Sequence, residues 1–289
     1  ACSAYRVAMT APQPPATTST AGSDDTAFAD DLALATELAD AADRITMAVF
    51  RSAELQVMTK PDRTPVTEAD QAVERMIRER LAAARPADTV LGEEFGATGG
   101  LQGRSWIIDP IDGTANYLRG VPIWATLIGL VIDGTPTLGM VSAPAMGRRW
   151  WAAPGVCATR DVDGRERDLG VSQVAILGDA HFSYSDAVGW PPGALDRLQS
   201  SVWRTRGFGD FYSHLLVAEG SVDIGVEPVL APWDVAALLP IVTGAGGQVT
   251  GTDGEPVLRP AADRWLVPSG LVSTNRTLHN EALRMFDAS

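Results

Sequence analysis

The chain has 289 residues, 45% of them hydrophobic and 20% charged, and a formal net charge of −13. Such a chain can bury a sizeable core, as one large domain or as two closely packed ones. Its acidity argues against a nucleic-acid binder that relies on a broad basic surface. Runs of about 18 apolar residues are lacking, so we expect no membrane span. Two cysteines, Cys2 and Cys157, are too few for a disulfide framework or a zinc cluster, and a cytoplasmic setting fits best.

The N-terminal quarter predicts a leader followed by two helices. Residues 1–25 are rich in Ala, Thr, Pro and Ser without an apolar period, which predicts a disordered leader with little role in function. From Leu32 to Phe50 apolar residues recur at helical spacing, and this predicts a long amphipathic helix. A short strand is expected at 55–59. A second helix is expected after Thr67, which can cap it.

Later segments predict strands first and then alternating helices and strands. Strands are expected at 90–91 and at 105–108, where Pro110 should end the strand. A hairpin over 124–132 and 137–142 and a strand at 149–153 should continue the sheet. Further helices are expected at 195–201, 210–219, 233–243 and 278–286, and further strands at 203–205, 222–226 and 248–250. We therefore expect helices layered on two sheets, with an N-terminal α+β part over 26–154 and a C-terminal α/β part over 155–289.

Two carboxylates three residues apart, Asp109 and Asp112, follow an apolar strand in the stretch WIIDPIDGTAN. A solvated turn is the ordinary explanation for such a pair. However, Pro110 fixes the backbone between them, which can aim both carboxylates and the Ile111 carbonyl at one point. Oxygen ligands of this kind suit Mg²⁺. Free backbone N–H groups at the helix start expected at Gly113 would suit a phosphate.

Three more acidic residues occupy comparable positions, and each also has an ordinary structural explanation. Glu93 follows a strand end between glycines, although paired glutamates are more often on the surface. Asp234 stands at an expected helix start, where it could simply be a first-turn acid. Asp70, in the first turn after Thr67, has the same alternative.

Four motifs, taken together and in this order, resemble the inositol monophosphatase family. They are residues 60–70, the stretch GEE at 92–94, the stretch DPIDGT at 109–114, and the stretch WDVAA at 233–237 with AGG at 245–247. The resemblance runs from about Phe28 to the C-terminus. It implies an αβαβα layered sandwich and a Mg²⁺-dependent, lithium-sensitive phosphatase that acts on small molecules. Members commonly form homodimers, to which the stretches VSAPAM and RRWWAA could contribute.

The resemblance also implies a set of metal ligands. Glu93, Asp109 and the Ile111 carbonyl would hold a first ion. Asp109, Asp112 and Asp234 would hold a second ion, and a third, looser ion would share Glu93 through water. Mn²⁺ in place of Mg²⁺ stays open. Such cations would neutralise the phosphate and lower the pKa of a water that attacks phosphorus in line.

The same resemblance assigns the residues around the attacking water. Thr114, hydrogen-bonded to Asp70, would orient the water together with Glu93. Gly113 and Thr114 would also meet the phosphate. No histidine is needed for this chemistry, and the three histidines of the chain are scattered along it.

Within the family, the stretches RGVPIWA and WRTRGFGDFYSHLLVAEGSVDIGVEP most resemble members that act on histidinol phosphate. Glu227 stands where inositol-type members hold a sugar hydroxyl, and here it would meet the substrate ammonium. Asp210 could face the imidazole or the amine, with a plain N-cap as its alternative. Two carboxylates beyond the metal ligands favour a substrate with a cationic amine over one that carries only hydroxyls.

Three other functions compete with a histidinol-phosphate phosphatase. The first is a phosphatase of the same fold that acts on inositol 1-phosphate or broadly on sugar or nucleotide phosphates. The second is a non-catalytic, metal-binding regulatory protein, against which Thr114 and Asp70 argue because metal storage needs no water-orienting pair. The third, an EF-hand calcium binder, fails on the spacing of its ligands.

Overall fold

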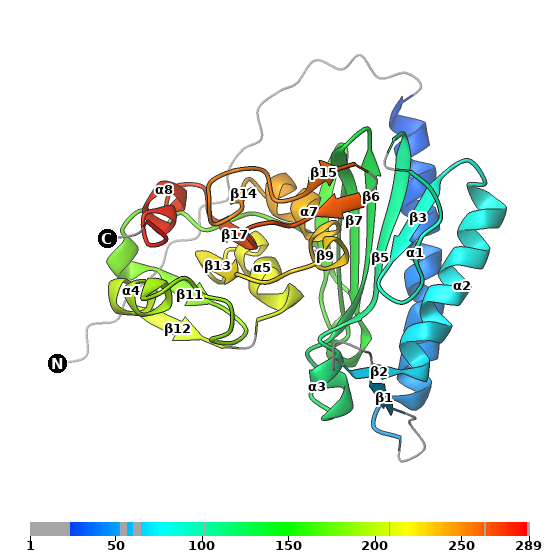
Figure 1. The fold of residues 1–289 in the computed structure, drawn as a ribbon, viewed down its shortest axis with the longest axis horizontal. Coiled ribbons are helices and arrows are strands. Elements are labelled where there is room, and N and C mark those ends of the chain that lie inside the picture. The colour runs from blue at the N-terminus through cyan, green and yellow to red at the C-terminus, as the bar shows by residue number, and fades with distance from the viewer. Residues whose placement is uncertain are drawn as a thin grey trace.

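The computed structural model describes residues 24–52, 57–59, 65–100, 102–207, 209–262 and 264–287. The expected leader therefore lies outside the described residues, except for Asp24 and Asp25, which belong to the first helix. The described chain forms five layers: α1 and α2, an eight-stranded sheet, α5 and α7, a five-stranded sheet, and α4 with α8 (Figure 1). This arrangement confirms the αβαβα sandwich expected from the sequence. None of the described helices is long and apolar enough to cross a membrane.

The larger sheet is covered by helices on both faces. Along β5, Ile107 joins the core shared with α5 and α7, while Trp106 and Ile108 join the core under α1 and α2. Because alternate side chains face the two helix layers, the strand is buried almost throughout. The strands run in the order β10-β9-β8-β7-β6-β5-β3-β4. Their bounds are β3 Thr89–Gly92, β4 Gly96–Ala97, β5 Arg104–Asp112, β6 Ala125–Ile132, β7 Thr135–Ala143, β8 Arg148–Ala153, β9 Val156–Arg160 and β10 Glu166–Asp168.

The smaller sheet has the strand order β12-β11-β13-β17-β14 and lies between α5 and α7 on one side and α4 and α8 on the other (Figure 1). Strands β11 and β17 were not anticipated. The larger sheet extends past residue 154, because β9 pairs with β8. The bounds are β11 His181–Ser183, β12 Arg204–Arg206, β13 Ile224–Glu227, β14 Gln248–Thr250 and β17 Leu271–Thr274, and two small hairpins add β1 Val57–Thr59 with β2 Pro65–Thr67 and β15 Arg259–Ala261 with β16 Arg264–Leu266.

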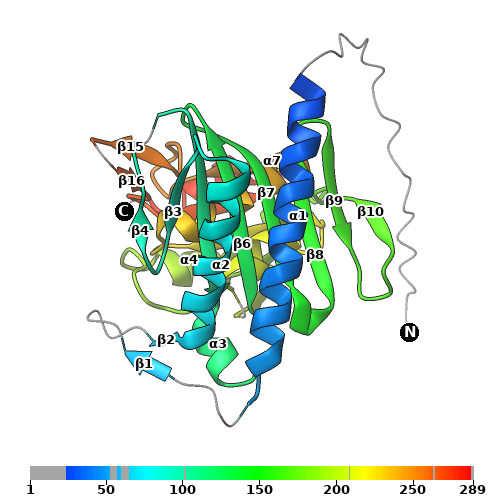
Figure 2. The same cartoon turned by 90° about the vertical axis from the view of Figure 1, so that its right-hand side faces the viewer.

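The helices α1 and α2 lie side by side across the outer face of the larger sheet (Figure 2). Thr67 caps α2 as expected, since its hydroxyl accepts from the N–H of Asp70 while the Asp70 carboxylate accepts from the N–H of Thr67. The bounds are α1 Asp24–Val49, α2 Glu68–Ala84, α3 Thr114–Leu118, α4 Ala194–Ser201, α5 Phe211–Ala218, α6 Pro232–Val235, α7 Leu238–Gly244 and α8 His279–Leu283.

The helix expected over 233–243 is in fact two helices, α6 and α7. Pro240 lies in the first turn of α7, where its missing N–H costs little. A continuous helix would place Pro240 in its interior, against the carbonyl of Ala236, so the chain breaks there. The link also passes very close to the sheet, because a Cβ on Gly139 would lie 2.0 Å from the Ala237 carbonyl oxygen.

The expectation that Pro110 ends its strand is wrong. Strand β5 continues to Asp112, and its pairing with β6 shifts between Asp109, opposite Leu127, and Asp112, opposite Ala125. One extra residue on β5 forms a bulge, where a proline without an N–H is tolerated. The bulge is where the two carboxylates of the motif leave the sheet.

Candidate active site

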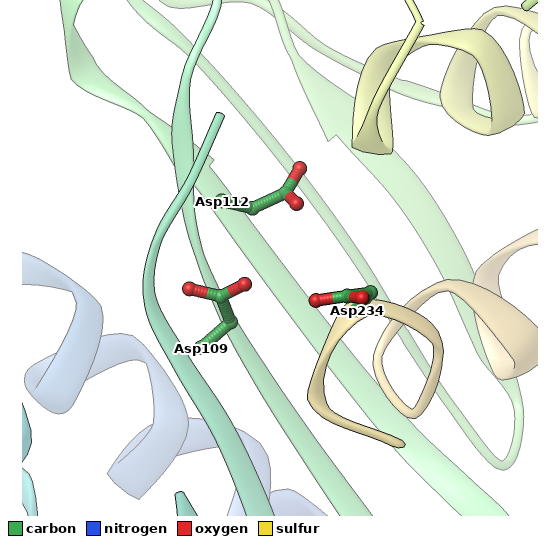
Figure 3. Close-up of side chains that lie close together, drawn as sticks. All are labelled: Asp109, Asp112 and Asp234. Carbon is green, nitrogen blue, oxygen red and sulfur yellow. The ribbon is translucent and has the colours of Figure 1, made fainter. Parts of the chain in front are cut away.

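Three aspartates converge between the larger sheet and the helix layer behind it. Asp109 and Asp112 come from the end of β5, and Asp234 comes from α6. One carboxylate oxygen of each lies within 4.8 Å of the others, and Figure 3 shows the three side chains directed at a common space. Asp109 is buried and the other two are half-buried. The structure therefore brings together three of the expected metal ligands, from positions up to 125 residues apart.

A backbone N–H fixes each of these carboxylates. Asp109 accepts from the N–H of Ile111 at 3.0 Å, across the proline. Asp112 accepts from the N–H of Phe211 at 2.9 Å. Asp234 accepts from the N–H of Ala231 at 2.7 Å, at the start of α6. The rotamers are thus set before any ligand arrives, which is how a preorganised site is built.

The three carboxylates repel one another. At an effective dielectric constant of about 20, unit charges about 4.8 Å apart repel by roughly 3 to 4 kcal/mol. Burial, with the neighbouring carboxylates, raises the pKa of Asp109 and Asp112 well above its usual range and raises that of Asp234 to about 7. No Lys or Arg among the described residues pairs with any of the three. An all-oxygen cluster with uncompensated negative charge fits a hard divalent cation.

Glu93 and Asp70 stand beside this cluster. Glu93 follows β3, and its N–H donates to the carbonyl of Ile108, the residue before Asp109, at 3.3 Å. Its charge raises the pKa of Asp109, Asp234 and Asp70, although in each case less than burial does. Burial, as the largest cause, raises the pKa of Asp70 to about 6. Both residues thus belong to one electrostatic unit with the three aspartates.

The expected hydrogen bond between Thr114 and Asp70 is not formed in the described structure. The Thr114 hydroxyl donates instead to the carbonyl of Ile111, three residues back, at 2.8 Å. One carboxylate oxygen of Asp70 caps α2 by accepting from the N–H and the hydroxyl of Thr67, at 2.8 and 2.6 Å. The other, Oδ1, is buried and has no hydrogen-bond partner among the described residues. Asp70 therefore keeps an unused acceptor, which a water or a rotated hydroxyl can satisfy.

Gly113 forms the start of α3, as the motif predicted. Its φ of 78° is left-handed, and a Cβ there would lie 3.0 Å from the Ile123 carbonyl oxygen, so only glycine fits. No side chain caps this helix start. Its backbone N–H groups are therefore placed to meet an anion beside the aspartate cluster.

A second acidic cluster adjoins the first. Glu227, at the end of β13, is only 5% exposed and accepts from the N–H of Asp210 at 3.0 Å and from the Ser185 hydroxyl. The Asp210 carboxylate accepts from the Asn116 side chain at 3.3 Å. Burial, followed by the charge of Asp210, raises the pKa of Glu227 to about 8. Asp210 is also the largest electrostatic contributor to the raised pKa of Asp112, after burial, so the two clusters are neighbours.

Asp210 does not act as a plain N-cap. It precedes α5, but its side chain makes no capping hydrogen bond. Its backbone has φ 50° and ψ −150°, a region that residues other than glycine rarely adopt. Strain of this kind persists where the surrounding structure imposes it, as at a ligand site.

Sequence reasoning missed Ser185 and Asn116, which support these two carboxylates. Neither belongs to a recognisable pattern, although Asn116 closes the stretch DGTAN. The three histidine rings contact other residues. The His214 ring contacts the Ser273 hydroxyl at 2.7 Å, the His279 ring contacts the hydroxyls of Thr250 and Thr274, each at 3.0 Å, and the His181 ring stacks on Trp203.

Comparisons with known proteins agree with this geometry. The model of the inositol monophosphatase family matches residues 29–288. The histidinol-phosphatase of Mycobacterium tuberculosis is 51% identical over 254 residues, covering 86% of this chain and 95% of that protein. The histidinol-phosphatase of Streptomyces coelicolor is 54% identical over 227 residues, covering 75% and 85%. A solved inositol monophosphatase from Zymomonas mobilis superposes with a TM-score of 0.77 at 30% identity, covering 91% of this chain and 99% of that one.

Proposed function

The chain belongs to the inositol monophosphatase family, and we propose that it is a histidinol-phosphatase, which hydrolyses histidinol phosphate to histidinol and phosphate. The observation that supports histidinol phosphate as the substrate is the pair of adjoining acidic clusters. The first, Asp109, Asp112 and Asp234, suits the cations that a phosphate ester requires. The second, Asp210 and Glu227, suits a cationic group on the same molecule. Histidinol phosphate carries both a phosphate and an ammonium group.

The metal cluster has a defined part in this proposal. Asp109, Asp112 and Asp234 would hold one divalent cation, and Asp109 would share a second with Glu93 and the Ile111 carbonyl. When bound, Mg²⁺ or Mn²⁺ neutralises the phosphate and lowers the pKa of water. The Ile111 carbonyl already accepts from Thr114, and its second lone pair remains for a cation.

The chain itself would place the water and the phosphate. Glu93, whose charge reaches Asp109, Asp234 and Asp70, would accept a hydrogen bond from the attacking water. Asp70 offers its unused oxygen Oδ1 for the Thr114 hydroxyl or for the same water. The N–H groups at Gly113 and Thr114 would receive the phosphate oxygens.

The second cluster would select the substrate. Glu227 is buried and already accepts two hydrogen bonds, so its carboxylate is held in one orientation. An ammonium group there forms a charge-assisted hydrogen bond, whereas a hydroxyl forms a weaker one. Asp210 adds a second negative charge on the same side. The pair therefore favours histidinol phosphate over inositol 1-phosphate by differential pairing.

A substrate panel tests the proposal. Purified protein is assayed with Mg²⁺ on histidinol phosphate, inositol 1-phosphate and an adenosine bisphosphate, and kcat/KM is compared. Histidinol phosphate should be the best substrate. If it were the poorest, the specificity proposal would fail and the broader phosphatase would take its place. Phosphate release absent with every divalent ion would support a non-catalytic metal-binding protein.

Three finer family properties stay predictions. Lithium should inhibit phosphate release by competing at the cation site. Two or three cations should bind per chain, which calorimetry with Mg²⁺ and with Mn²⁺ counts. The chain should form a homodimer, with the stretches VSAPAM and RRWWAA at or near the interface, which light scattering after size exclusion checks.

A further inference from the structure

Glu74, in the middle of α2, is a fully buried carboxylate that has no direct role in the phosphate hydrolysis proposed here. Its two oxygens face the turn that connects β3 to β4. Oε2 accepts from the N–H of Glu94 at 2.7 Å, and Oε1 accepts from the N–H of Phe95 at 3.1 Å. A buried charge is retained only when it is paired and hydrogen-bonded, and the N–H groups of this turn supply hydrogen bonds to both oxygens of Glu74.

The contact between the helix and the turn is close on every side. A Cβ on Gly92 would lie 2.1 Å from Oε1 of Glu74, so the carboxylate rests against the bare Cα of that glycine. Arg78, one helical turn further along α2, pairs with Glu74 at 2.7 Å and donates to the Gly96 carbonyl. The turn from Gly92 to Gly96 is thus held at both of its ends by one face of α2.

Glu93 lies inside this turn. On one side its N–H donates to the carbonyl of Ile108 on β5, and on the other the two N–H groups that follow it donate to Glu74. The turn can therefore not shift along the sheet or away from it without breaking one of these contacts. The direction of the Glu93 side chain depends on both.

We propose that Glu74 is a positioning residue for the hydrolytic reaction, which fixes the Glu93 carboxylate relative to Asp109 and Asp234. The proposal rests on the proposed function in so far as Glu93 serves a cation. Asp70, Glu74 and Arg78 follow one another at four-residue spacing, so they share one face of α2. That face therefore sets the position of Asp70 and of the Glu93 turn together. Residues that support a metal ligand in this way typically contribute 10- to 100-fold to metal affinity or activity.

The test compares Glu74→Gln with Glu79→Gln, an exposed glutamate on the same helix. Glutamine keeps the size of the side chain but replaces one carboxylate oxygen by an N–H₂ group, which cannot accept from the turn N–H that it faces. The turn that carries Glu93 then loses one of its two hydrogen bonds to α2. We expect Mn²⁺, titrated alone and followed by electron paramagnetic resonance, to bind about 10- to 100-fold more weakly to Glu74→Gln. The value of kcat should fall by a similar factor while KM changes less than about threefold. Glu79→Gln should behave as wild type in all three measurements.

A merely structural role would lower the melting temperature of Glu74→Gln and leave Mn²⁺ affinity and kcat per folded molecule unchanged, which overturns the proposal. If Glu74→Gln does not fold, Gly92→Ala replaces it, because the added Cβ pushes the same carboxylate off the turn without removing its negative charge. Gly92→Ala should then lose Mn²⁺ affinity in the same range, and wild-type affinity would overturn the proposal. Because the Mn²⁺ titration needs no substrate, its result is separate from failure of the proposed phosphatase activity.

Discussion

The backbone N–H of Phe211, at the start of α5, donates a hydrogen bond of 2.9 Å to the carboxylate of Asp112, at the end of β5. The preceding N–H, that of Asp210, donates to Glu227 at 3.0 Å. These two consecutive backbone N–H groups therefore hold a carboxylate of the proposed metal cluster and a carboxylate of the proposed amine site. Recognition of the phosphate end and of the amine end of a substrate would therefore both depend on the N–H groups of Asp210 and Phe211.

The first prediction concerns the metal cluster. Asp109→Asn and Asp112→Asn should each lower turnover at least about 100-fold. Each removes a negative charge that would contact a cation directly, whereas a residue that only supports a ligand contributes less. The measurement is kcat at saturating Mg²⁺. Asp196→Asn, on the exposed face of α4, serves as the control and should keep wild-type activity. Retention of more than a tenth of the activity in either cluster variant would contradict the assignment.

The second prediction concerns the amine site. Glu227→Gln should raise KM for histidinol phosphate about tenfold or more, since a hydrogen bond to a charged group contributes about 1.5 to 3 kcal/mol. The KM for inositol 1-phosphate, which carries no amine, should change less than about threefold. Steady-state kinetics on both substrates decide the matter. An equal rise in KM for both substrates would show that Glu227 supports the site in general and does not recognise the amine.

The third prediction uses the backbone strain at Asp210. Asp210→Gly removes the carboxylate and relieves the conformation at φ 50°, so the melting temperature should stay the same or rise. The kcat/KM for histidinol phosphate should nevertheless fall. Asp210→Asn is the matched variant, since it keeps the strain and loses only the charge, and it should lose specificity without gaining stability. A drop in the melting temperature of Asp210→Gly would mean that the side chain stabilises the fold.

The fourth prediction is the pH dependence of the metal-free protein. In the folded chain the pKa of Asp70 is about 6 and that of Asp234 about 7, both above the ordinary value of 3.8. Folded protein thus holds these protons more tightly than unfolded protein does. Their contribution to stability is full below pH 3.8 and is lost as the pH rises through about 6 to 7.

Thermal melts with a chelator should therefore show a melting temperature that falls between about pH 4 and pH 7, because unfolded protein ionises these carboxylates from about pH 4 while folded protein keeps them protonated up to about pH 6 to 7. Added Mg²⁺ should restore stability at the upper pH and have little effect at the lower, because protons and cations compete for the same oxygens. Asp109→Asn should flatten the dependence. If the melting temperature of the metal-free wild type rose over this range, the carboxylates would not repel one another in the folded protein as proposed.

The sequence predicted the convergence of the three aspartates well because its main element is local. Asp109 and Asp112 stand three residues apart at the end of one strand, so no long-range contact is needed to bring them together. Asp234 was predictable from the order of motifs along the chain. The sequence did not reveal that β5 runs on through Pro110, because that bulge exists only in the pairing of β5 with β6.

Other features depend on tertiary contacts that no local pattern contains. The resemblance implied a hydrogen bond from Thr114 to Asp70, 44 positions away, whereas in the turn into α3 the Thr114 hydroxyl donates to the nearby Ile111 carbonyl. Ser185 supports Glu227 from 42 positions away, and Asn116 supports Asp210 from 94. Glu74 looks like any other helix glutamate until its contacts with the turn around Glu93 are known.

The most direct measurement is the anomalous scattering of a crystal soaked in Mn²⁺. We predict a strong peak between Asp109, Asp112 and Asp234, with carboxylate oxygens of all three in its coordination sphere. Three aspartates directed at separate places, with no peak between them in a crystal that binds Mn²⁺ elsewhere, would contradict it.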